Sequence, residues 1–129
     1  MTRKIGIVLV GLMALLQLAY ACFAFLDPGG FATLRGTQLV DFGDADWVRV
    51  YASRTLFVAL IVGYLLYRRQ FGLLAAASLF GLVMPVTDAW LAYQASAPTG
   101  VIAKHVATAV FLFVTFGVLR AVQSSSSER

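Results

Sequence analysis

The chain has 129 residues, of which 60% are hydrophobic and only 12% are charged, and its mean hydropathy is +0.85. A soluble domain typically has about 25% charged residues, so this composition excludes an ordinary water-soluble protein and predicts an integral membrane protein. The formal charge of +4 does not indicate nucleic-acid binding, because the basic residues stand singly or in pairs at the ends of apolar runs. The single cysteine excludes an internal disulfide, a CxxC redox pair and a thiolate metal cluster.

The first apolar run, residues 5–26, is long enough to span a membrane and follows the basic residues Arg3 and Lys4. A basic N-terminus predicts a cytoplasmic start, so this segment runs outward. An A-x-A pattern at residues 19–21 also fits a cleaved signal peptide. We favour a retained helix, because the apolar run continues past that pattern, and we keep cleavage as the alternative.

The stretch after the first span is the longest connection in the chain. Residues 27–30, Asp-Pro-Gly-Gly, end the first helix, because proline and glycine oppose its continuation. Residues 31–47 follow and contain Arg35 and three aspartates, and they predict an external loop whose apolar residues pack against the helix ends or lie in the interface. The aspartates are Asp41, Asp44 and Asp46. Their spacing matches no strong metal-binding signature, so no metal site is predicted and the role of this acidic loop stays open.

Three further apolar segments are long enough to span a membrane: residues 48–67, 71–93 and 101–122. The short basic turn at residues 68–70 makes the second and third spans an antiparallel hairpin and marks the cytoplasmic side. Pro85 removes one backbone hydrogen bond from the third span and predicts a kink there. The polar residues 123–129 predict a disordered tail.

These segments predict one all-α domain over residues 1–129, an integral membrane four-helix antiparallel bundle with one longer external loop between helices 1 and 2. Basic residues flank the spans on one side and aspartates lie on the other. Both termini are therefore predicted to be cytoplasmic, since positively charged flanks stay on the cytoplasmic side.

Ionisable residues from three different predicted helices fall at a similar depth: Arg54, Asp88, Lys104 and His105. Residue counts at about 1.5 Å each place all of them in the outer third of the membrane. An ionisable group inside a span costs roughly 2.5 to 3.5 kcal/mol or more without a partner. We therefore predict Arg54 as the charge partner of Asp88 and His105 as its proton partner.

This charged layer has two interpretations. The first is an outward-facing polar intramembrane pocket that binds or acts on a small amphipathic or lipid-like molecule. In it, Asp88 and His105 are candidate catalytic residues for proton transfer, and they join Arg54, Lys104 and Tyr51 as candidate ligand-binding residues. The alternative is a structural or accessory membrane subunit, in which an Arg54–Asp88 pair only fixes helix packing. The pattern leaves open whether the protein is an enzyme, and no cofactor is predicted.

Short motifs at several positions carry a resemblance to a known group of proteins. The first span ends in F-x-D-P-G-G-F at residues 25–31, the second begins with Y-A-S-R at residues 51–54, and the third and fourth carry a late Asp88 and an early His105. In these features the chain resembles small bacterial four-helix membrane proteins of the DoxX-like group and related uncharacterised families. The resemblance implies a compact multi-pass protein of the inner (plasma) membrane, mostly without an assigned activity, and it singles out Arg54, Asp88 and His105.

The expected partners follow from this architecture. They are the lipid bilayer, a small amphipathic ligand, and either further copies of the chain or a larger membrane protein. Gln17 and Tyr20, spaced i and i+3, add a polar face to the first span. Four helices are too few for the paired repeats of secondary transporters, so a transporter would have to oligomerise. The sequence does not identify the ligand.

Overall fold

The computed structural model describes residues 1–41 and 43–127, and nearly all of that length is helical. In chain order the helices are α1 (Thr2–Leu26), α2 (Pro28–Leu34), α3 (Asp44–Tyr67), α4 (Phe71–Phe80), α5 (Val83–Gln94) and α6 (Thr99–Ser127). Helices α4 and α5 together form one span, so the described residues contain four helical stretches that are long and apolar enough to cross a membrane. The prediction of an all-helical, multi-pass membrane protein is confirmed.

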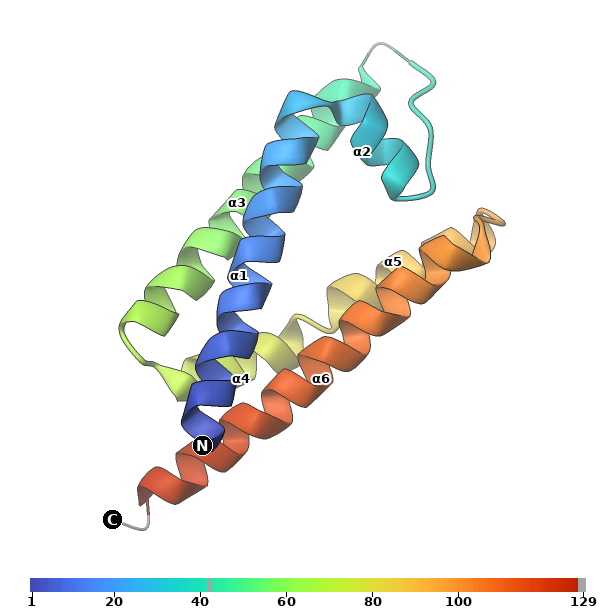
Figure 1. Cartoon of the computed structure of the whole chain (residues 1–129). Helices are drawn as coiled ribbons and strands as arrows, with labels where there is room; N and C mark the ends of the chain where they lie inside the picture. Colours follow the sequence, from blue (N-terminus) through green and yellow to red (C-terminus); the bar gives the residue numbers. More distant parts are fainter. Residues whose placement is uncertain (42, 128–129) are drawn as a thin grey trace.

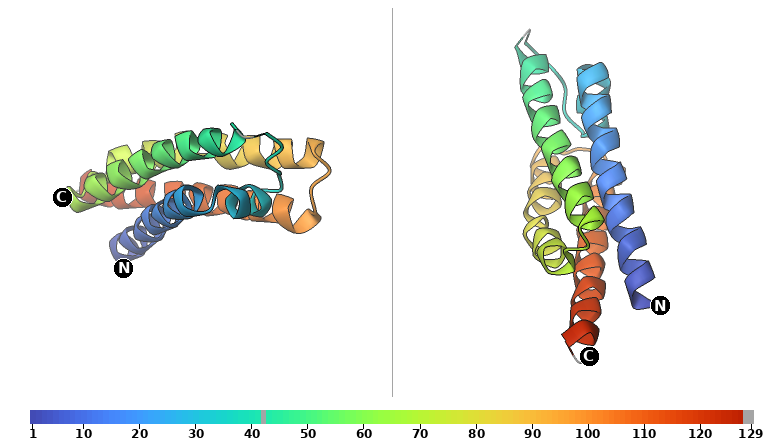
Figure 2. Two further views of the ribbon diagram at one scale, coloured as in Figure 1. Left: turned by 90° about the horizontal axis from the view of Figure 1, so that it is seen from above. Right: turned by 90° about the vertical axis from the view of Figure 1, so that its left-hand side faces the viewer.

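The spans form two pairs that cross near one end of the molecule and diverge toward the other (Figure 1). Helix α1 packs along α3, and α6 packs along both α4 and α5. The pairs meet where α1 contacts α6, with Gly6 of α1 beside Leu119 of α6. Consecutive spans run in opposite directions and both termini lie at the crossing end (Figures 1 and 2). Helix α2 lies at the other end, where the pairs are farthest apart.

Two buried clusters hold this arrangement together. The larger lies where the pairs cross and consists of Val10, Met13, Val62, Leu74, Ala75, Leu112 and Leu119. The smaller joins α2 to α1 and α3 and consists of Ala24, Phe31 and Ala52. The Phe31 ring packs edge-on against Tyr20 and Phe23 at centroid distances of 6.0 and 5.8 Å. Because aromatic side chains bury large apolar areas, Phe31 fixes α2 to the α1–α3 pair.

Helix α2 occupies the start of the connection that was predicted to be an external loop. Asp27 ends α1 and caps α2, since its Oδ1 accepts a hydrogen bond of 2.9 Å from the Gly30 N–H. Pro28 stands in the first turn of α2, where its missing N–H costs nothing. The Asp-Pro-Gly-Gly motif therefore ends one helix and begins another, which turns the chain back between the two pairs.

The third span is interrupted at Gly81 and Leu82, one turn before Pro85. A proline ring collides with the carbonyl group four residues earlier in a regular helix, and for Pro85 that carbonyl belongs to Gly81. The Gly81 carbonyl instead accepts a hydrogen bond of 3.2 Å from the Met84 N–H. The predicted kink is present, but it lies at the displaced carbonyl rather than at the proline itself.

Two helix boundaries differ from the prediction by four or five residues, and the other differences are smaller. Helix α3 begins at Asp44 rather than at residue 48, and α6 continues to Ser127 rather than ending at residue 122. The start of the predicted disordered tail is therefore helical, and residues 128–129 lie outside the described residues. Continuation of a helix keeps its backbone groups paired beyond the apolar segment.

A substitution at Gly30 tests the cap of α2. A Cβ atom at Gly30 would collide with the Asp27 carboxylate, whose Cγ would be 2.8 Å away, whereas a Cβ at Gly29 would lie at an ordinary 3.8 Å from Asp27 Oδ1. We expect Gly30→Ala to lower the free energy of unfolding by about 1 kcal/mol through loss of the cap, and Gly29→Ala to leave it nearly unchanged. Unfolding in mild detergent, followed by circular dichroism, measures both. Equal stability of the two variants would contradict this account of the cap.

Candidate functional site

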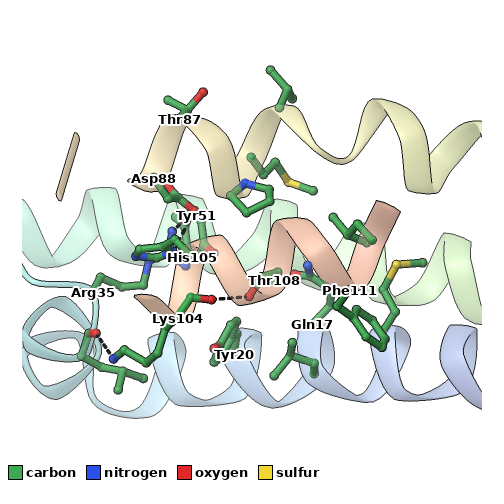
Figure 3. A pocket seen from close by; sticks show the side chains of 17 residues that line it. Gln17, Tyr20, Arg35, Tyr51, Thr87, Asp88, Lys104, His105, Thr108 and Phe111 are labelled. Atoms are coloured by element: carbon green, nitrogen blue, oxygen red, sulfur yellow. Dashed lines mark hydrogen bonds and ion pairs between the residues drawn. The ribbon is translucent and has the colours of Figure 1, made fainter. Parts of the chain in front are cut away.

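A cavity of about 310 Å³ lies between the two helix pairs, beside α2 (Figure 3). Its walls come from α1, α3, α5 and α6 and from the C-terminal end of α2. The polar lining residues are Gln17, Tyr20, Arg35, Tyr51, Thr87, Asp88, Lys104, His105 and Thr108. The apolar lining residues are Met13, Leu16, Leu34, Val83, Met84, Pro85, Phe111 and Leu112.

The charged and apolar lining residues separate along the helix axes. The charged residues lie near α2, whereas most of the apolar ones come from the middle of the spans. Along α6, the cavity extends from Lys104 to Leu112, which is about 12 Å at 1.5 Å per residue. The cavity is therefore amphipathic, with a charged end near α2 and an apolar end deeper in the membrane span.

The carboxylate of Asp88 forms an ion pair with the guanidinium of Arg35, and the two side chains are only 29% and 18% exposed. The Arg35 guanidinium also lies over the rings of Phe31 and Tyr51, at 5.9 and 5.6 Å from their centroids. Arg35 is the C-cap residue of α2. It therefore links α2 to α3 through the ring of Tyr51 and to α5 through the ion pair.

The predicted pairing of Arg54 with Asp88 is wrong, because the structure pairs Asp88 with Arg35. Arg54 is exposed and does not line the cavity. The buried residues of α3 are Ala52, Thr55, Ala59 and Val62. A depth estimate from residue counts gives the level of a side chain but not its face, and Arg54 points away from this buried face.

His105 is almost fully enclosed, with 6% of its surface exposed. Its Nδ1 lies 3.9 Å from Oδ2 of Asp88, which is beyond hydrogen-bond distance. Among the described residues, its Nε2 is buried and has no hydrogen-bond partner. A buried polar atom without a partner costs about 1 to 3 kcal/mol, so Nε2 is the group in this cavity that most needs a bound molecule or water.

Lys104 and Tyr51 also line the charged end of the cavity. The Lys104 ammonium donates a hydrogen bond of 2.9 Å to the Leu34 carbonyl at the end of α2, where helix carbonyls carry partial negative charge. Figure 3 shows Arg35, Asp88 and His105 converging from the end of α2, from α5 and from α6. The structure thus brings Tyr51, Asp88, Lys104 and His105 to one cavity, while their roles in binding or catalysis stay predictions.

A model of one protein family matches residues 5–119, a range that includes every residue lining the cavity. The chain belongs to that family, DUF4267, described as a domain of unknown function. No curated protein and no solved structure matches the chain. The family match agrees with the expectation of an uncharacterised family, and it does not confirm membership of the DoxX-like group.

Arg35 is the charged cavity residue of this DUF4267 protein that sequence reasoning missed. It was assigned to an external loop, whereas it closes a helix and enters the cavity. The pattern Asp27-Pro28, a capping residue followed by proline, is a helix start signal and could have indicated α2. Gln17 and Tyr20, predicted as a polar face of the first span, do line the cavity.

The three aspartates of the acidic loop, Asp41, Asp44 and Asp46, do not line the cavity. Asp44 accepts hydrogen bonds from the backbone N–H groups of Val40 and Asp41, and Asp46 pairs with Arg49 at 3.0 Å on the exposed surface. Phe42 lies outside the described residues. Within residues 1–41 and 43–127, no group of three or more His, Cys, Asp or Glu side chains could hold a metal ion.

A double-mutant cycle distinguishes the two candidate partners of Asp88. We expect Arg35→Gln and Asp88→Asn to be coupled by roughly 1 to 2 kcal/mol in the free energy of unfolding, because each change alone leaves the other group shielded and unpaired. Arg54→Gln provides the matched control, and its effect should add to that of Asp88→Asn. Denaturation of the wild type, the three single variants and the two double variants in one detergent measures both cycles. A larger coupling between Arg54 and Asp88 would refute the assignment.

Proposed function

We propose that this protein binds a small amphipathic or lipid-like molecule in the cavity between the two helix pairs. The observation that carries the proposal is the buried, unpaired Nε2 of His105 at the charged end of a cavity whose other end is apolar. Ligand sites typically combine apolar walls with a few polar groups that orient the ligand. A ligand with a polar head near His105 would supply the missing hydrogen bond, and its apolar part would lie against the deeper wall.

The same arrangement supports acid–base chemistry on a bound molecule. A carboxylate beside one ring nitrogen of a histidine orients the ring and leaves the other nitrogen to accept or donate a proton. Here Nδ1 faces Asp88 at 3.9 Å, so a hydrogen bond between them would require the two side chains to move closer, and Nε2 is the unpaired atom. Asp88 and His105 therefore remain the candidate catalytic pair, although the binding function does not depend on catalysis.

The alternative role, a structural or accessory membrane subunit, takes a modified form in this structure. Its ion pair would be Arg35–Asp88, which ties α2 to α5 without needing a ligand. The unpaired Nε2 favours the binding function, because a purely structural pair gains nothing from a neighbouring buried histidine without a hydrogen-bond partner.

We propose further that both termini face the cytoplasm and that the protein lies in the inner membrane of a bacterium. The basic residues flanking the spans at the end of the molecule that holds the termini are Arg3, Lys4, Arg68, Arg69 and Arg120. Short basic flanks stay on the cytoplasmic side. In this orientation the charged end of the cavity lies in the outer leaflet.

Filling the apolar end of the cavity tests the binding function. We expect mass spectrometry of protein purified with native lipids to detect a co-purifying small molecule with the wild type and to lose it with Met84→Trp. Met84 lines the cavity, so an indole at this position occupies the space that the ligand needs. Val86→Trp is the matched control, because Val86 lies on the same helix, is 57% exposed and does not line the cavity.

The recovery of the co-purifying molecule distinguishes the binding function from the structural role. Loss of the molecule with Met84→Trp and its retention with Val86→Trp support a ligand in the cavity. Equal recovery from all three proteins, or no co-purifying molecule from any of them, would favour the structural role instead.

Reporter fusions test the orientation. A phosphatase that is active only outside the cytoplasm should be inactive when fused after Arg129 and active when inserted in the turn at residues 95–98. The positive-inside distribution of the flanking residues is the physical reason. Measured enzyme activity in intact cells gives the answer, and an active C-terminal fusion would reverse the proposed orientation.

A further inference from the structure

The charges that line the cavity constrain the head group of its ligand. Arg35 and Lys104 contribute two positive charges and Asp88 one negative charge, so the fixed charges sum to +1 when His105 is neutral. Lys104, which supplies the excess positive charge, is exposed at the charged end of the cavity, and a ligand of opposite charge that binds there pairs with it. We infer that the cavity binds a single-chain amphiphile with a monoanionic head, such as a carboxylate, that enters sideways from the lipid layer. The inference rests on the proposed binding function.

Lys104 and His105 have hydrogen-bonding capacity left for this head group. The Lys104 ammonium has three N–H donors, and the structure records one bond from it, to the Leu34 carbonyl. The His105 Nε2 is unpaired and can donate when protonated there. Arg35 is engaged by Asp88, so the excess positive charge of this end comes from Lys104. A carboxylate is suited to these groups, because charge-assisted hydrogen bonds are roughly twice as strong as neutral ones.

The size of the cavity favours one alkyl chain. Its volume of about 310 Å³ is at the lower limit of the roughly 300 to 1,000 Å³ of small-molecule sites. The deeper wall offers flexible or flat apolar side chains that suit a hydrocarbon tail, Met13, Met84 and Phe111 among them. A double-chain lipid would need more room than this wall encloses.

The cavity opens sideways between α5 and the α1–α3 pair. Helix α5 packs against α6 and makes few close approaches to α1 or α3 in the described part of the chain. Val83 and Met84 line the cavity and are nevertheless 66% and 41% exposed, in the middle of the third span. This opening therefore faces the hydrocarbon layer rather than water.

The end of the cavity near the membrane surface is covered by α2 and the residues that follow it. Gly36, with a φ of +83°, packs against the turn before α6, where an added Cβ would lie 3.1 Å from the Ala97 Cβ and 3.0 Å from Val101 Cγ1. Lys104 ties the end of α2 to α6 through the Leu34 carbonyl. With α2 lying over this end and exposed apolar residues along the side, an amphiphile dissolved in the bilayer has a direct entry.

Binding of three probes with the same alkyl chain tests the head-group assignment. The full-length protein in phosphatidylcholine nanodiscs is titrated with radiolabelled dodecanoate, dodecanol and dodecylamine at alkaline pH, where the acid is ionised, and binding to empty nanodiscs is subtracted. We expect saturable binding that is tightest for dodecanoate. Excess acetate should not displace dodecanoate, because acetate has no tail.

Lys104→Met should weaken dodecanoate binding roughly tenfold through loss of a charge-assisted hydrogen bond and leave dodecanol binding unchanged. Lys104→Arg should retain binding, which separates loss of charge from loss of fold. Arg54→Met is the matched control, because it removes an exposed cation outside the cavity.

Each contrary outcome has a distinct meaning. Equal or tighter binding of dodecanol or dodecylamine, or an unchanged dodecanoate affinity in Lys104→Met, would overturn the anionic head group and leave the binding function intact. Displacement of dodecanoate by acetate would overturn the amphiphile in favour of a small soluble anion. No saturable binding of any probe would overturn this inference, and the native-lipid purification then decides separately whether the binding function also fails.

Discussion

The ion pair between Asp88 and Arg35 is the interaction on which the rest of this structure depends. A carboxylate inside a membrane span requires a partner, and here the partner comes from α2, a short helix outside the four spans. The Asp27 cap begins that helix and Phe31 fixes it to α1 and α3. Asp88 in the third span thus obtains its ionic partner from the short helix that begins where the first span ends.

A cavity can form beside this ion pair because the two helix pairs diverge. Pairs that packed along their full length would bury their apolar faces against each other and leave no cavity. Instead the larger buried cluster lies at the crossing, and α2 lies between the pairs at the opposite end. The break before Pro85 also interrupts the third span at the level of the cavity. The space between α2 and the point where the helix pairs cross is therefore lined both by apolar mid-span residues and by charged residues near the membrane surface.

Sequence patterns were sufficient for the spans and for four of the cavity residues, but not for the pairing of charges. Hydropathy defines a span because about 20 apolar residues are needed to cross the bilayer. Depth, counted along each span, grouped Arg54 with Asp88, Lys104 and His105, and the structure brings the last three and Tyr51 to one cavity. The face of a helix was not predictable in the same way, since lipid-facing and core-facing residues are both apolar, and Arg54 was therefore assigned to the wrong face. Arg35 was missed because a connection rich in glycine was interpreted as a loop.

His105 is the residue from which the proposed binding function is argued. Asp88 has an ionic partner in Arg35, and Lys104 has a carbonyl acceptor, so neither group needs the histidine as a hydrogen-bond partner. An apolar side chain in its place would remove the cost of burying an unpaired ring nitrogen. Burial of the imidazole at this position is free of that cost only if another group in the cavity completes its hydrogen bonding. In the proposed binding function, the deeper apolar wall would contact a hydrocarbon part of the ligand.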